Sequence, residues 1–91
     1  MNREIFRVPV VAPHNYEAFR ALIDDAPATH GGWIELMQKR QTEESHRGFV
    51  IRDVHVNPEK FASFCRGRGR ATNFVTLWHF VEETDPQNNY R

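Results

Sequence analysis

A short basic segment is the part of the chain whose residue types best suit binding chemistry. Arg66, Arg68 and Arg70 alternate with two glycines, Lys60 precedes them, and no acidic residue lies in between. Glycine lets backbone N–H groups approach a ligand, and arginine forks pair with phosphate or carboxylate through two hydrogen bonds. Thr72 would begin the next helix and turn its positive end toward the same space. The pattern predicts a site for a small anion or an acidic partner.

The same segment has two other interpretations. It is also compatible with a solvated loop whose arginines cap a helix and pair with Glu82, Glu83 or Asp85. A role as an accessory nucleic-acid binder is the third hypothesis. The chain has 12 basic and 12 acidic residues, and this zero net charge argues against a dedicated nucleic-acid binder, since such affinity grows with the number of phosphates neutralised.

The five histidines do not form a metal-binding pattern. None sits at zinc-finger or H-E-x-x-H spacing, and the single Glu43-x-x-His46 is only half of the set used by carboxylate-bridged metal bundles. We therefore predict no metal and no cofactor. An alternative function is a small enzyme of ferredoxin-like build, with a pocket between sheet and helices in which His55 or His79 would act as the acid–base group.

The only cysteine, Cys65, is predicted to be structural. A nucleophilic cysteine needs a lowered pKa and a nearby base, and the neighbouring Arg66 and Arg68 would favour the first. However, Cys65 shares a helical face with Phe61 and Phe64, which predicts burial. One cysteine cannot form an internal disulfide, which favours a reducing compartment.

The amino-terminal residues do not resemble a secretion signal. Their apolar run is interrupted by Arg7, Pro9 and Pro13, whereas a signal peptide needs 7–15 uninterrupted apolar residues. No segment approaches the ~20 apolar residues of a membrane helix. We expect a cytoplasmic protein without a membrane partner.

Hydrophobic periodicity predicts the elements that must position these residues. Alternation indicates strands, and spacing of three to four indicates helices. The expected order is β-α-α-β-α-α, a single small α/β (α+β) domain over residues 1–83 with a flexible tail over 84–91. Strands are expected over 4–11 and 49–56, the first at a sheet edge because Pro9 cannot donate to a ladder. One helix is expected after Asn15 and is stopped by Pro27, and the others are expected over 33–47, 58–66 and 74–83. Asn15, Asn57 and either Thr72 or Asn73 are expected helix caps, and Gly67 is expected to end the third helix.

Residues 33–47 decide the fold class. As a hairpin strand they would give the order βαββαβ, a ferredoxin-like fold. As a helix they place opposite charges four residues apart, at Glu35–Lys39, Lys39–Glu43, Arg40–Glu44 and Glu43–Arg47, with Gly48 at the end. A strand does not need such pairs, so we predict a helix.

The last helix indicates self-association. Its apolar residues cover well over half of its circumference, more than the ~100° stripe of an ordinary surface helix. Two strands also make a thin sheet, which a second copy could extend. We therefore predict a homodimer whose interface includes Phe74, Trp78, Phe80 and Val81. The preferred function is a non-enzymatic interaction module.

The run GFVIRDVHVNPEKFASFCRGRG resembles a pattern of small bacterial proteins, including some carried on mobile gene cassettes. In these a strand is followed by Asn/Asp-Pro, an acid, a Phe and a short helix that ends in Cys and Gly. The resemblance covers about a quarter of the chain. It implies a bacterial, cytosolic origin and transfers no activity and no site residues.

Overall fold

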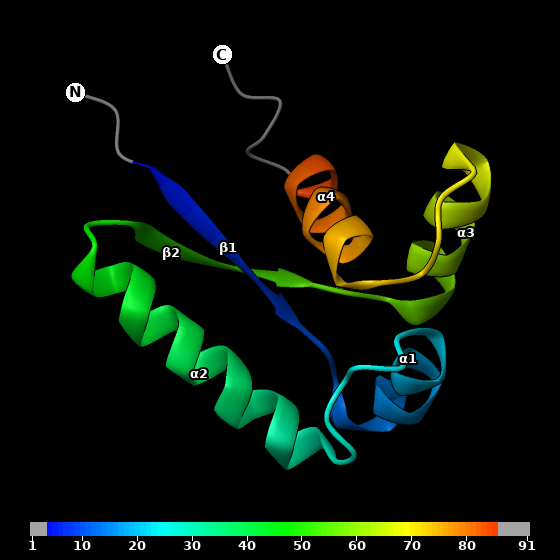
Figure 1. The fold of residues 1–91 in the computed structure, drawn as a ribbon, viewed down its shortest axis with the longest axis horizontal. Coiled ribbons are helices and arrows are strands. Elements are labelled where there is room, and N and C mark those ends of the chain that lie inside the picture. The colour runs from blue at the N-terminus through cyan, green and yellow to red at the C-terminus, as the bar shows by residue number, and fades with distance from the viewer. Residues whose placement is uncertain (1–3, 86–91) are drawn as a thin grey trace.

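The computed structural model describes residues 4–85, which form two strands, four α-helices and one 3₁₀ turn (Figure 1). In chain order these are β1 (Ile5–Val10), η1 (Pro13–Asn15), α1 (Tyr16–Leu22), α2 (His30–His46), β2 (Val50–His55), α3 (Pro58–Arg68) and α4 (Phe74–Thr84). The predicted order β-α-α-β-α-α is confirmed, and the chain is a small mixed α/β domain.

The two strands pair in parallel, from Ile5 opposite Val50 to Val10 opposite His55. Parallel neighbours need a long crossover, and α1 and α2 provide it. The ferredoxin-like alternative is wrong, because residues 33–46 lie in α2 and form no hairpin strand. Of the four predicted charge pairs, Arg40–Glu44 is present at 3.9 Å.

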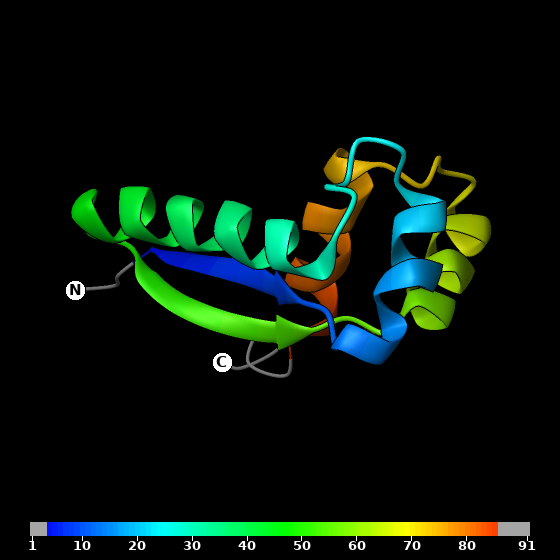
Figure 2. The same cartoon turned by 90° about the horizontal axis from the view of Figure 1, so that it is seen from below.

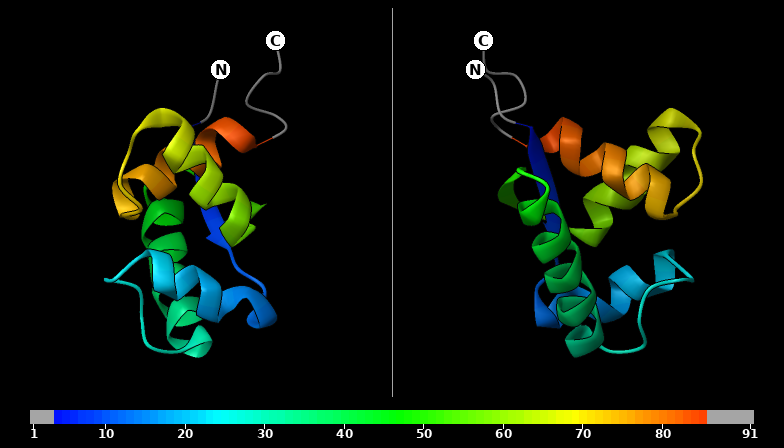
Figure 3. Two further views of the ribbon diagram at one scale, coloured as in Figure 1. Left: turned by 90° about the vertical axis from the view of Figure 1, so that its right-hand side faces the viewer. Right: turned by 60° about the vertical axis from the view of Figure 1, so that its left-hand side comes forward.

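The helices lie on both sides of the sheet. α2 runs along one face, whereas α4 lies across the other (Figures 1 and 2). α3 packs beside α4, and α1 closes the carboxyl end of the strands against α3 (Figure 3). Large side chains from all of these elements fill the core, including Phe19, Trp33, Phe61, Leu77 and Phe80.

Asparagine side chains begin the last two helices as predicted. The side-chain oxygen Oδ1 of Asn57 accepts hydrogen bonds from the backbone N–H groups of Glu59 (2.9 Å) and Lys60 (3.2 Å). Asn73, rather than Thr72, caps α4 by accepting from Thr76 N at 2.9 Å. The Asn15 side chain makes no capping bond, because η1 leads directly into α1 and Asn15 already has helical backbone angles.

Two predicted boundaries are corrected. Gly67 does not end α3: the helix continues to Arg68, and Gly69 ends it in the left-handed conformation (φ 62°). The predicted tail over 84–91 begins too early, because Thr84 closes α4 and Asp85 is buried. Residues 86–91 lie outside the described part of the chain.

Between residues 4 and 85, no helix combines the length and the apolar character needed to cross a bilayer.

Candidate functional site

The structure does not bring the predicted anion-binding residues together, because Arg68 is engaged elsewhere. Arg68 forms a two-point ion pair with Glu83 on α4, with Nη1–Oε2 at 3.1 Å and Nη2–Oε1 at 2.5 Å. Its guanidinium also lies over the Phe64 ring, 4.7 Å from the centroid. The hydrogen bond from Arg68 lowers the pKa of Glu83 below its ordinary value, and His79 and Arg70 add to this effect. Arg68 therefore connects α3 to α4.

The other predicted anion ligands do not converge around Arg68. Lys60 lies in the first turn of α3 and Arg68 in the last, so they are about 12 Å apart along the axis at 1.5 Å per residue. Gly67 is helical, so its backbone N–H is not presented by a loop. Arg66 and Arg70 are exposed and Thr72 is half-buried. An anion site at Arg66 and Arg70 stays a prediction.

The predicted α4 interface is wrong for two of its four residues. Phe80 and Val81 are buried in the core of a single subunit. Phe74 is half-buried and stacks on Trp33, with ring centroids 5.9 Å apart and an angle of 13°. Among the described residues of α4, Val75 is the large apolar side chain left exposed, at 63%.

The apolar circumference of α4 is covered because α2 and α4 meet around β1. Trp78 packs against Phe6 at 5.7 Å, and the Arg40 guanidinium lies 5.6 Å from both ring centroids. Cation–π contacts of this kind are favourable at partly exposed sites. The spacing of apolar residues along α4 does not reveal that α2 and α4 pack around the same strand, β1.

The outer edge of β1 is occupied in part, at Pro9. Val50 N donates to Glu4 O (2.9 Å) and Val56 N donates to Val10 O (2.8 Å). The backbone N–H and C=O groups of the even-numbered residues of β1 therefore point toward β2, and those of the odd-numbered residues point away from it. Pro9 therefore lies at an outward position, where no N–H is needed. Its carbonyl oxygen accepts a hydrogen bond from Trp33 Nε1 at 3.1 Å. The prediction that Pro9 marks a strand edge is confirmed.

The outer edge of β2 is open. By the same two-residue repeat, the backbone groups of Ile51, Asp53 and His55 point away from β1. No turn, loop or cap among residues 4–85 makes a backbone hydrogen bond to them, and β2 forms the margin of the described structure (Figure 2). Asp53 and His55 are exposed, as is Val50 at 37%.

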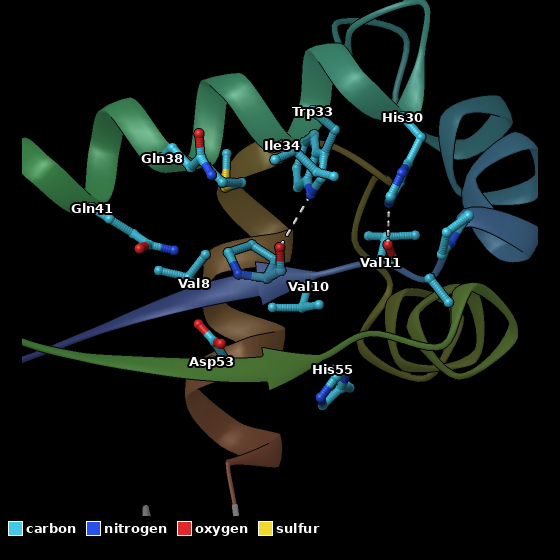
Figure 4. A pocket seen from close by; sticks show the side chains of 14 residues that line it. Val8, Val10, Val11, His30, Trp33, Ile34, Gln38, Gln41, Asp53 and His55 are labelled. Carbon is cyan, nitrogen blue, oxygen red and sulfur yellow. Dashed lines mark hydrogen bonds between the residues drawn. The ribbon is translucent and has the colours of Figure 1, made fainter.

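A pocket of about 460 Å³ lies between α2 and the carboxyl half of the strands (Figure 4). Its walls are apolar, formed chiefly by Val8, Val10, Trp33, Ile34 and Met37. The polar side chains that line it are His30, Gln38, Gln41, Asp53 and His55. His55 was predicted to lie in such a pocket, but Asp53 and the two glutamines were missed. No motif in the sequence indicates which polar residues of α2 and β2 face each other across the pocket.

The second acid–base candidate lies elsewhere. His79 lines a separate hollow of about 310 Å³, with Phe6, Arg40 and Trp78, at the outer edge of β1. Cys65 is buried among the core residues, and burial raises the pKa of its thiol. A raised pKa keeps a thiol protonated and unreactive. The predicted structural role of Cys65 agrees with this environment.

A buried ion pair cluster holds α4 on the sheet. Asp85, directly after α4, receives hydrogen bonds from Arg7 on β1 and Arg52 on β2. The bond to Asp85 is the main cause that raises the pKa of Arg52 above its ordinary value. This cluster attaches the carboxyl end of α4 to both strands.

Within residues 4–85, no three His, Cys, Asp or Glu side chains come together as metal ligands would. Comparison with known proteins gives no family model, no curated protein and no solved structure that matches this chain.

Proposed function

We propose that the protein is a non-enzymatic interaction module that forms a homodimer through the outer edges of β2. The observation that carries this proposal is the row of backbone groups at Ile51, Asp53 and His55, with which no residue between 4 and 85 pairs. Such an edge is a ready template for another strand. Because Pro9 offers no N–H and its carbonyl oxygen is already bonded by Trp33, β2 is the better side for this sheet to grow from.

A second copy is the occupant that the edge fits best. The two strands are already supported by α2 and α4, and a second β2 would supply partners for the backbone groups at the open edge. A two-fold axis perpendicular to the sheet would pair β2 with β2 of the partner in antiparallel fashion. The product is a continuous four-stranded sheet with the order β1-β2-β2-β1.

The charges of Asp53 and His55 favour one register for the pairing of β2 with β2 of the partner. Asp53 and His55 are alternate residues, so they project from the same face. An axis through Val54 sets Asp53 opposite His55 of the partner subunit twice, and each of these pairs exchanges two backbone hydrogen bonds. An axis through Asp53 would instead oppose two carboxylates, which is destabilising. The edge of β2 is therefore complementary to a second copy of itself when the axis passes through Val54.

The test exchanges these two residues. The single changes Asp53→His and His55→Asp each create like pairs across the axis, whereas the double exchange restores unlike pairs. Sedimentation equilibrium over a concentration series reports the mass of each variant. We expect wild type and the double exchange to reach twice 10.7 kDa, and each single variant to shift toward one subunit.

Two controls keep the result specific. Glu35→His, on the solvent side of α2, changes the same charge without touching β2 and should dimerise as wild type does. Amide hydrogen exchange should show protection of Asp53 and His55 that rises with concentration. A wild type that stays at one subunit mass at tens of micromolar, or a double exchange no better than the singles, overturns the proposal.

A further inference from the structure

The pocket between α2 and β2 has the composition of a small-molecule site. Its volume of about 460 Å³ lies within the ~300–1,000 Å³ of ligand pockets, which combine apolar walls with a few polar groups. Val8, Trp33 and Met37 are buried and form a fixed floor. Ile34 lines the same pocket yet is 42% exposed, so a bound apolar group would cover surface that now faces water.

The polar groups of the pocket come from two opposing elements. Gln41 extends from α2 toward the strands, Gln38 lines the pocket beside α2, and Asp53 extends from β2 into the space between (Figure 4). None of these three side chains forms a hydrogen bond or ion pair with another described residue. His30 is different, because its Nε2 already bonds the Val11 carbonyl oxygen at 2.7 Å. Three partner-free polar side chains thus surround an apolar floor.

The charge of the lining determines the class of ligand. Among the described residues that line the pocket, Asp53 is the only carboxylate, and none is a lysine or an arginine. A carboxylate beside apolar walls is strongly complementary to an ammonium group, since hydrogen bonds to charged groups are stronger than neutral ones. The two glutamine carbonyl oxygens can accept its remaining protons.

We propose that this pocket binds a small organic amine, with its apolar body on Val8, Trp33 and Met37 and its ammonium group held by Asp53 and the amides of Gln38 and Gln41. This inference goes beyond the proposed homodimer and does not depend on it, since all of the named groups belong to one subunit. A carboxylate has two oxygens, so Asp53 can accept from an ammonium group and from a neighbouring subunit together.

Three probes of nearly equal shape test the class: benzylamine, benzyl alcohol and benzoate. Each is titrated into ¹⁵N-labelled full-length protein at neutral pH, and the shifts of the Gln38 and Gln41 side-chain amides and of Trp33 Nε1 locate binding. We expect benzylamine to bind most tightly, benzyl alcohol about tenfold more weakly because it lacks the charged hydrogen bonds, and benzoate not to bind.

Variants distinguish a loss of ligand binding from a loss of folding. Asp53→Asn should weaken benzylamine about tenfold and leave benzyl alcohol unchanged, whereas Glu35→Gln, an exposed acid of α2, should change neither. Ile34→Trp should weaken both by filling the mouth. Because Asp53 and Ile34 are exposed, both variants should keep the wild-type spectrum away from the pocket.

Several outcomes would overturn the proposal. One is that millimolar benzylamine leaves the Gln38, Gln41 and Trp33 signals unmoved. Another is that the three probes bind equally, or that benzoate binds best, because charge would then not select the ligand. Sedimentation of the same samples reports the oligomeric state separately, so a failed dimer and a failed pocket give different results.

Discussion

Arg52 holds Asp85 in a two-point contact, with Nε–Oδ2 at 3.0 Å and Nη2–Oδ1 at 2.9 Å, and the carboxylate is fully buried. Arg7 reaches the same carboxylate at 2.8 Å. Arg7 and Arg52 are also register partners on neighbouring strands, so Asp85 neutralises two like charges that would otherwise repel each other. The end of α4 is thereby attached to both strands.

Replacing Asp85 by Asn should destabilise the fold strongly. The change removes the charge that both guanidinium groups need, and breaking a buried pair on one side costs about 3–5 kcal/mol. Arg7 and Arg52 retain some contact with water, so we expect a value near the lower end. Urea unfolding measures it, with Glu82→Gln on the exposed side of α4 as the control. A loss no larger than that of Glu82→Gln would contradict the structural role of Asp85.

The sequence was sufficient to predict the helices and strands, because the local signals agreed with the final structure. Each of these signals belongs to a single segment, as do the spacing of opposite charges in residues 33–47 and the helix start at Asn57-Pro58. They required no knowledge of the neighbouring elements. The Pro9 edge assignment succeeded for the same reason, since a missing N–H limits where a residue can lie in a sheet.

The candidate sites could not be predicted as fully, because they depend on which elements meet. The apolar surface of α4 was taken as an interface, whereas Phe80 and Val81 pack inside the subunit. Asp53, Gln38 and Gln41 had no motif, and they come together through the parallel pairing of β1 and β2. Asp85 was assigned to the arginines of 66–70 as one possible partner, but Arg7 and Arg52 bind it.

The Arg68–Glu83 pair should make part of the stability dependent on pH. The pKa of Glu83 is lowered in the folded protein, chiefly by Arg68, so its contribution is present above the ordinary glutamate pKa and is lost as the pH falls through the lowered value. Arg68→Ala should therefore reduce stability at neutral pH and have less effect in acid. High salt should weaken the effect, since the pair is exposed.

Titration of the Glu83 carboxyl carbon by NMR measures this directly. Arg68→Ala should move the Glu83 titration toward the ordinary range, whereas Arg66→Ala, from the same helix turn, should have little influence. Equal shifts in both variants would mean that the general positive charge of α3, rather than the Arg68 contact, lowers the Glu83 pKa.

Cys65 should react slowly with thiol reagents in the folded protein. Its side chain is 2% exposed, and burial raises the thiol pKa, so both access and thiolate formation are restricted. We expect modification by iodoacetamide only after unfolding, at a rate that follows the denaturation curve. Rapid labelling of the native protein would show that α3 opens locally.

Gly67 and Gly69 should respond to alanine in opposite ways. Gly67 is inside α3, where alanine is favoured over glycine by about 0.8–1 kcal/mol, and a Cβ there meets no atom within 4 Å. Gly69 also has free space but lies at φ 62°, where a Cβ costs roughly 1–2 kcal/mol. Thermal unfolding should show that Gly67→Ala raises Tm and Gly69→Ala lowers it. If Gly67 ended the helix instead, as the sequence pattern had predicted, Gly67→Ala would lower Tm.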